Sequence, residues 1–215
     1  MTNDALRTLL PIAGWAEDRA SEVEITGDSD PILPTPFLIG ETSAAALSAV
    51  GLAVSDLWDL RTGRRQEIAV DTRQATASLR SGHYMQMDGA PVSSDRNPMM
   101  GVYPAMNGRW SYLHCNFPNH RAAALSVLGV EEDREAMARA VAKWDALELE
   151  EAIIAANGAG GMVRTMDEWA QHPQGVAVAS LPLLEIVKIG DSPSEKLPDG
   201  DRPLSGIRVL DLTRV

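Results

Sequence analysis

Cysteine and positive charge are both scarce in this sequence. Cys115 is the one cysteine among 215 residues, so no disulfide can form within the chain. Lys and Arg number 19 against 30 Asp and Glu, and the formal charge of -11 repels nucleic acid and anionic membrane surfaces. The densest basic group, Arg61, Arg64 and Arg65, is too small to offset this charge. We therefore expect no nucleic-acid partner and no membrane partner.

The sequence also lacks the marks of export or of a membrane span. Residues 1–10 have neither the cationic start nor the long apolar stretch of a secretory signal. The most apolar window, residues 44–60, is interrupted by Asp56 and Asp59 and is shorter than the ~20 apolar residues that a spanning helix needs. These absences predict a cytoplasmic protein in which residues 44–60 form a helix buried on most of its sides.

The first half of the chain has the pattern of a layered α/β fold. Three prolines within residues 31–36 exclude a regular helix there, and Thr42 or Ser43 is expected to cap the helix that follows. The turn RTGRRQ ends that helix, with Gly63 free to adopt a positive φ. A strand at 67–71 and a helical segment at 72–85 come next, and this succession predicts an α/β fold.

The second half predicts a small α+β arrangement. Residues 87–104 are rich in Gly, Pro, Asn and Ser and are expected to form a loop, whereas Asn107-Gly108 predicts a hairpin turn within 105–117. Helices are predicted from 118 to Gly129, over 133–143, after Asp145 with Glu148, and after Thr165 with Glu168 at the third position. Apolar strands are predicted at 181–190 and 206–212, on either side of a polar linker.

Several of these segments resemble those of one protein family. The closing segment RPLSGIRVLDLTRV resembles the Pro-Leu-x-Gly-x-x-Val-Leu-Asp-Leu strand with which family III CoA-transferases, of CaiB/BaiF type, begin. The matching residues are Pro203, Leu204, Gly206, Val209, Leu210, Asp211 and Leu212. The turn at 61–66 is similar to the family's Arg-Thr-Gly-x-Gly-Gln turn, with Arg65 in place of the second glycine. Residues 101–114 and 144–175 resemble the family's hairpin and helical tail, so the likeness spans about residues 40–215.

The resemblance implies a domain layout for a partial, tandem member of the family. It implies a partial Rossmann-like large α/β domain over 1–100, a small α+β domain over 101–190, and a linker over 191–203. Residues 204–215 would be the first strand of a second CoA-transferase module. Family members form interlaced dimers, so we expect a homo-oligomer or pairing with a complementary catalytic half.

The resemblance also implies a chemistry. Family members move CoA between an acyl-CoA and a carboxylic acid through an aspartyl intermediate, or epimerise an α-methylacyl-CoA. The family's nucleophilic aspartate matches no residue here, so we predict that this 215-residue chain is inactive alone, and a non-catalytic assembly module is the alternative. Coenzyme A would be a substrate and not a permanently bound cofactor. Arg61, Arg64 and Arg65 are candidates for contacting its phosphates, because guanidinium groups bind phosphate in bidentate fashion.

Three other groups have weaker functional interpretations. Asp71 is a candidate carboxylate nucleophile, although a solvated residue at a strand end is favoured. The set of His114, Cys115 and His120 lacks the spacing of a structural zinc site, so ordinary packing is favoured over metal binding or a thiol nucleophile. The glycine-rich segment 157–161 is favoured as a helix stop over a phosphate-binding loop.

Overall fold

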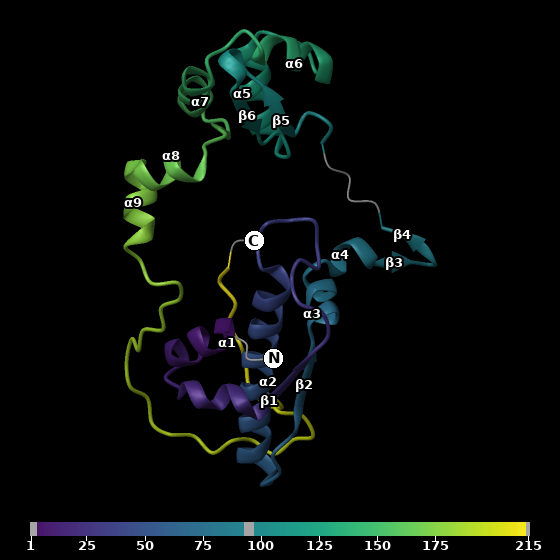
Figure 1. Ribbon diagram of the computed structural model, residues 1–215, viewed down its shortest axis with the longest axis vertical. Helices are drawn as coiled ribbons and strands as arrows, with labels where there is room; N and C mark the ends of the chain where they lie inside the picture. Colours follow the sequence, from purple (N-terminus) through teal and green to yellow (C-terminus); the bar gives the residue numbers. More distant parts are fainter. Residues whose placement is uncertain (1–3, 93–96, 214–215) are drawn as a thin grey trace. The chain divides into compact units, whose positions relative to one another are not determined.

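The computed structural model describes residues 4–92 and 97–213 and divides the chain into two compact units. The first unit consists of Met1–Val92 and Leu183–Val215, and the second of Ser93–Pro182. Figure 1 labels the helices and strands of both. Helices and small sheets occur in each unit, which confirms a mixed helix-and-sheet fold.

The first unit is built around two parallel strands, β1 (Val23–Thr26) and β2 (Ile68–Asp71). Because parallel strands need a crossover connection, the chain passes between them through the long helix α2 (Ile39–Thr62) (Figure 1). The remaining elements are α1 (Asp4–Leu9), η1 (Leu10–Ala13), η2 (Glu17–Glu22), α3 (Thr72–Leu79), α4 (Ser81–Tyr84), β3 (Gln86–Met87) and β4 (Ala90–Pro91). The core of this unit consists of Leu6, Leu10, Val23, Ile25, Ala44, Ala45, Leu52 and Ala75.

Helix α2 begins earlier than the sequence predicts. The carboxylate of Asp30 accepts hydrogen bonds from the backbone N–H groups of Gly40 and Glu41, both at 2.9 Å, and so caps the helix from a distant loop. The hydroxyls of Thr42 and Ser43 donate instead to carbonyls four residues earlier, as they do inside helices. The predicted cap at Thr42 or Ser43 is therefore wrong, because a side chain ten residues upstream supplies it.

The burial of α2 also differs from the prediction. By length and composition alone it could cross a membrane, but its Ala44, Ala45 and Leu52 lie in the core and it packs against α1, α3 and β2. Its opposite side is open, since Val50 is 58% exposed. The prediction of a helix buried on most sides is therefore wrong, and α2 is buried along one side. The predicted end at Gly63 is confirmed by its φ of 70°.

The second unit contains an antiparallel sheet in the order β5-β6-β7, formed by β5 (Gly101–Pro104), β6 (Trp110–Leu113) and β7 (Gly160–Met162). The predicted hairpin is confirmed: η3 (Met106–Gly108) joins β5 to β6, and Asn107 and Gly108 both have positive φ. The prediction of a loop over 87–104 is wrong in two places, because this range contains strand β5 and most of the β3–β4 pair. Neither was predicted because turn-forming residues surround them.

Helices cover one face of this sheet. They are α5 (Pro118–Leu128), α6 (Arg134–Val141) and α7 (Ala146–Ala155). The core that they form with the sheet includes Tyr103, Leu113, Met137, Leu149 and Ile153. Two further helices, α8 (Met166–Gln171) and α9 (Pro173–Ala179), follow and pack against each other. The predicted N-cap at Asp145, the capping box of Thr165 with Glu168, and the helix end at Gly129 are confirmed.

The two apolar strands predicted near the end of the chain are not formed. Between Ala179 and Thr213 the described residues contain no strand, so the predicted first strand of a second module at 204–215 is absent from the described residues up to Thr213. A strand is stable only when its backbone groups pair with a neighbour. Neither segment has such a neighbour in the part of the chain that the structure describes, and Ile189 is 98% and Leu212 84% exposed.

Candidate functional site

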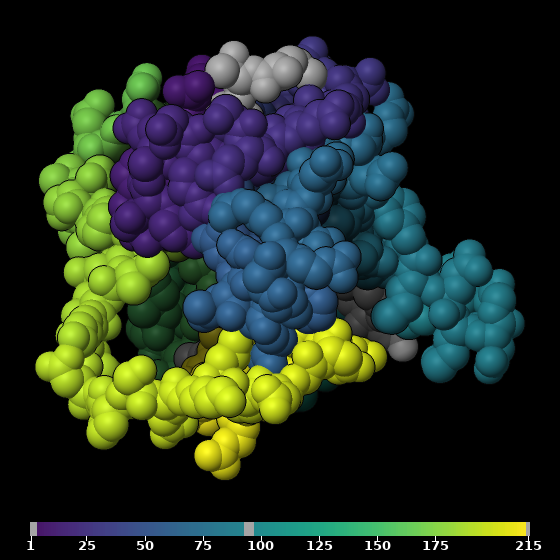
Figure 2. Space-filling view, turned by 90° about the horizontal axis from the view of Figure 1, so that it is seen from below, coloured from purple at the N-terminus to yellow at the C-terminus, as the bar shows by residue number. Residues whose placement is uncertain are grey.

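The three predicted phosphate-contacting arginines surround the turn at the C-terminal end of α2, which we call the arginine turn (residues 61–65). Arg61 donates hydrogen bonds to three backbone carbonyls of the returning C-terminal segment. These are the carbonyls of Pro198, of Pro203 at 3.2 Å and of Ser205 at 2.8 Å. Figure 2 shows this segment in yellow across the blue end of the first unit. The guanidinium of Arg61 is thus occupied by the chain itself.

Arg65 belongs to a network of ion pairs. Its Nη2 lies 2.5 Å from Oε2 of Glu22 and 2.8 Å from Oδ1 of Asp56. Arg19 contacts the same two carboxylates at 2.8 Å each. Hydrogen bonds and charge from Arg19, together with those from Arg65, hold the pKa values of Glu22 and Asp56 below their ordinary range. This network joins η2 to α2, so Arg65 has a structural role.

Arg64 differs from its two neighbours. Its side chain is exposed, and within residues 4–92 and 97–213 it makes no hydrogen bond or ion pair. It is therefore the arginine of the turn that is available to an anion from solution. The structure brings all three predicted residues to one turn but leaves only this guanidinium unoccupied among the described contacts.

A hollow of about 290 Å³ lies beside the arginine turn. Val54, Trp58 and Gln66 line one side, and Asp201, Arg202 and Pro203 of the C-terminal segment line the other. Trp58 contributes an aromatic face to the lining, and Arg202 contributes a guanidinium whose charge is offset by the neighbouring carboxylate of Asp201. Trp58 and Arg202 could not be predicted as neighbours from the sequence, because no local pattern brings together residues more than 140 positions apart.

Asp71 serves as a helix cap. It ends β2, and its Oδ1 accepts a hydrogen bond from the backbone N–H of Gln74 at 2.8 Å, at the start of α3. On its other side Gly27 approaches so closely that a Cβ there would lie 2.7 Å from Oδ2 of Asp71. The Asp71 carboxylate is thus closely packed and hydrogen-bonded, which supports a role as helix cap over a role as nucleophile.

The predicted His114, Cys115 and His120 set lies in the second unit as a packed cluster. The imidazole centroids of the two histidines are 5.9 Å apart, and Phe117 packs against both rings. Cys115 is fully buried, and burial raises the pKa of its thiol, which disfavours the reactive thiolate. Among the described residues no three His, Cys, Asp or Glu side chains are placed to hold a metal ion.

The glycine-rich segment 157–161 ends a helix, as the favoured interpretation predicts. The N–H of Asn157 bonds the carbonyl of Ile154, and the N–H of Gly158 bonds that of Ile153. Gly160 then enters β7, where a Cβ would lie 2.9 Å from a side-chain carbon of Leu113. Close packing of the sheet on its helices, and not phosphate binding, accounts for this glycine.

Comparisons with known proteins relate the chain to one group. The sequence matches no protein-family profile. It is 24% identical over 239 aligned positions to an acyl-CoA transferase of Gibberella moniliformis, and this alignment covers 94% of the chain and 42% of that protein. The fold matches the hypothetical protein Rv3272 of Mycobacterium tuberculosis with a TM-score of 0.56 at 12% identity, over 79% of this chain and 51% of that one.

A third relative carries a family name. A CAIB/BAIF family protein from Brucella suis matches the fold with a TM-score of 0.52 at 12% identity, over 80% of this chain and 50% of that one. The chain therefore spans about half the length of the relatives that it matches. In sequence this chain is therefore similar to an acyl-CoA transferase, and in fold it is similar to a protein of the CAIB/BAIF family.

Proposed function

We propose that this chain is part of a protein that transfers CoA between an acyl-CoA and a carboxylic acid. The observation that carries the proposal is the match to an acyl-CoA transferase over 94% of the chain, which includes parts of both units. The mixed fold supports it, because a CAIB/BAIF family protein has a similar fold in a match that covers 80% of the chain. Coenzyme A enters this proposal as a substrate.

The proposed reaction proceeds through an aspartyl intermediate. A carboxylate attacks the acyl-CoA carbonyl, the C–S bond breaks, and CoA leaves as the thiolate while a mixed anhydride forms. The thiolate then attacks the aspartyl carbonyl and releases the first carboxylate. The carboxylate of the second acid attacks the resulting aspartyl-CoA thioester, the C–S bond breaks, and a second mixed anhydride forms as the CoA thiolate leaves. The thiolate then attacks the carbonyl of the second acid, which gives the new acyl-CoA and releases the aspartate carboxylate. We assign the aspartate to no residue of this chain, since Asp71 is committed to capping α3.

The purified 215-residue chain is accordingly expected to be inactive. Incubation with an acyl-CoA and a second carboxylic acid, followed by chromatography of the CoA esters, should show no exchange above a protein-free control. Exchange by the chain alone would mean that its nucleophile lies among the residues present. Racemisation is the related alternative, and loss of deuterium from the α-carbon of a labelled 2-methylacyl-CoA would identify it.

We further propose that Arg64 contacts a phosphate of CoA. Arg64 is exposed and lies two residues before Gln66, which lines the hollow with Trp58, whereas Arg61 and Arg65 are already bound to other groups of the chain. A ligand that binds the native state raises the melting temperature. CoA should therefore raise the Tm of the wild type, Arg64→Gln should reduce the shift, and Arg80→Gln, at another exposed arginine of the first unit, should preserve it. Equal shifts for both variants would contradict the assignment.

A second candidate function is that of an assembly module. It is favoured by the apolar segment 183–189, in which Leu183 is 74% and Ile186 75% exposed. Exposed apolar surface of this kind marks interaction sites. Sedimentation of the purified chain tests it, because oligomers that dissociate after Ile186→Lys would support assembly and a monomer at all concentrations would oppose it.

A further inference from the structure

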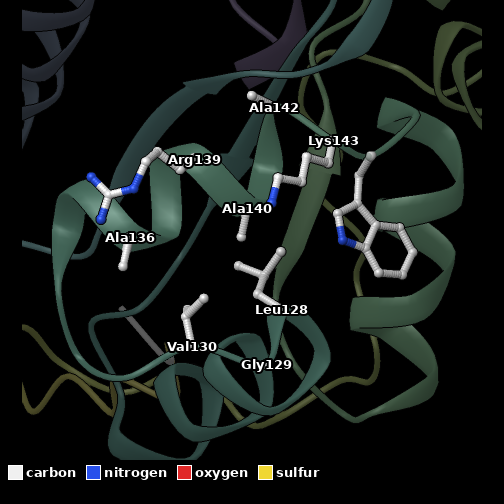
Figure 3. Close-up of a pocket in the computed structure, with 9 residues that line it drawn as sticks. Leu128, Gly129, Val130, Ala136, Arg139, Ala140, Ala142 and Lys143 are labelled. Atoms are coloured by element: carbon white, nitrogen blue, oxygen red, sulfur yellow. The ribbon is translucent and has the colours of Figure 1, made fainter.

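The second unit contains a hollow that the proposed CoA chemistry does not use. It measures about 650 Å³ and lies between the end of α5 and the end of α6 (Figure 3). This volume falls within the roughly 300–1,000 Å³ of small-molecule sites. All of its lining residues lie between 128 and 144, so one short stretch of chain builds it.

The floor of the hollow is apolar and its frame is fixed by backbone hydrogen bonds. Gly129 ends α5 with a φ of 65°, and the chain turns there toward α6. Leu128 and Val130, on either side of this turn, face Ala140 of α6 across the hollow (Figure 3). Trp144 lines the same hollow, and its own backbone N–H bonds the carbonyl of Val141 at 2.9 Å. The carbonyl of Trp144 accepts from the N–H of Met106 at 2.9 Å, which anchors it to the sheet connection.

The charge in the hollow comes from one side chain. Lys143 extends into the space above Leu128, with its ammonium group toward Ala140 (Figure 3). Within the described residues Lys143 forms no ion pair, and no acidic residue lines the hollow. Arg139 also belongs to the lining, but its guanidinium points away from the centre and lies 3.5 Å from Glu135 (Figure 3). One uncompensated ammonium therefore stands over an apolar floor, in a protein whose formal charge is -11.

We propose that this hollow binds a small organic carboxylate with an apolar body. The carboxylate would pair with the ammonium of Lys143, and the apolar body would lie on Leu128, Val130 and Ala140. A single compact cation matches one carboxylate better than the several charges of a polyphosphate, for which arginine forks are preferred. An apolar floor gives no advantage to an inorganic anion. The site lies wholly in the second unit and needs no CoA. A test of carboxylate binding here is therefore independent of a test of the proposed transferase function.

Trp144 supplies a direct readout of binding. The chain has five tryptophans, so the ¹⁵N-labelled protein should give five indole N–H signals, and Trp144→Phe assigns the one from the hollow. Titration with octanoate should shift this signal saturably, with a dissociation constant on the order of 1 mM. Octanol has the same chain without the charge and should bind more weakly. Octanol binding as tightly as octanoate, or no saturable shift with octanoate, would refute the proposal.

Variants distinguish the contribution of the Lys143 ammonium to octanoate binding from that of the general surface charge. Lys143→Met should weaken octanoate binding roughly fivefold to tenfold, as expected for a partly exposed ion pair. Lys143→Arg should retain binding, and Arg139→Gln should change it less than about twofold, since that guanidinium points away from the site. The four remaining indole signals report whether each variant is folded. Unchanged affinity in folded Lys143→Met would show that the lysine is only a solvated residue at a helix end.

Discussion

The ion pair between Glu150 and Arg164 is expected to be a principal source of stability in the second unit. Both nitrogens of the Arg164 fork lie 2.8 Å from the two carboxylate oxygens of Glu150, and the N–H of Met162 donates to the same carboxylate at 2.7 Å. The side chains are only 14% and 16% exposed. This carboxylate therefore joins α7 to the end of β7 and to Arg164 just beyond it, through three hydrogen bonds with little competition from water.

The cost of Glu150→Gln follows from this geometry. Removing one partner of a buried pair leaves the other charge desolvated, which costs about 3–5 kcal/mol when burial is complete. The glutamine oxygen still accepts one hydrogen bond, and some solvent reaches Arg164, so we expect about 2–3 kcal/mol here. Arg164→Met in the same chain should restore part of the loss, because no unpaired charge then remains.

The contribution of the Glu150–Arg164 pair to stability should depend on pH in a direction that follows from the pKa of Glu150. Hydrogen bonds from Arg164 hold the pKa of Glu150 below its ordinary value, so the folded state favours the charged form. The pair contributes fully above the unfolded pKa of about 4.3, and its contribution is lost as the pH falls through the lower pKa of the folded state. The difference in stability between wild type and Glu150→Gln should therefore be constant near neutrality and shrink in acid.

Native-state hydrogen exchange provides the assay, because it reports on the second unit alone. The amides of Leu149 and Gly158, both hydrogen-bonded in or next to α7, should lose protection by roughly 30-fold to 150-fold at neutral pH. Glu135→Gln is the matched control, since its pair with Arg139 is exposed and worth at most about 0.5 kcal/mol. A loss below about 1 kcal/mol for Glu150→Gln would refute the reasoning from burial.

Three further predictions concern single groups. Cys115 should not react with a thiol reagent in the folded protein and should react once in denaturant, because it is buried and burial raises the pKa of its thiol. Asp30→Ala should destabilise the first unit by about 1–2 kcal/mol in urea unfolding, since α2 loses its cap. The pKa of Glu168, lowered to about 2 by hydrogen bonds from Arg109 and Thr165, should rise on Arg109→Met when the carboxyl is titrated by NMR, and an unmoved midpoint would contradict the assignment.

Local signals in the sequence predicted local structure well. The cap at Asp145, the capping box at Thr165 and the helix end at Gly129 each depend on residues within one turn of one another, and all three are confirmed. Strand β1 was not predicted, although the alternation in VEIT matches its alternating burial, because four residues amid polar neighbours give a weak signal.

Long-range pairing set the limit of sequence-based prediction. The segments around Ile189 and Leu212 have the composition of strands, yet neither pairs with a neighbour among the described residues.

The same limit applies to the arginine turn, where the position of Arg61 at a helix end was evident from the sequence but its carbonyl partners were not. The hollow lined by Lys143 and Trp144 was also missed, because the helix was predicted to continue to residue 143, whereas α6 ends at Val141. The N-cap at Asp145 was the available signal that the helix stops before these two residues.

The contacts of Arg61 have a consequence for biosynthesis. The carbonyls that it binds are made 137 to 144 positions later, after the whole of the second unit. During translation the second unit is therefore completed first, as an insertion in an unfinished first unit, and α2 emerges long before its C-terminal covering segment. Closing so long a loop costs little more entropy than closing one of half the length, at about 0.6 kcal/mol per doubling. The main consequence is therefore a delay in time, because Arg61 has none of these carbonyl partners until residues 198–205 have been synthesised.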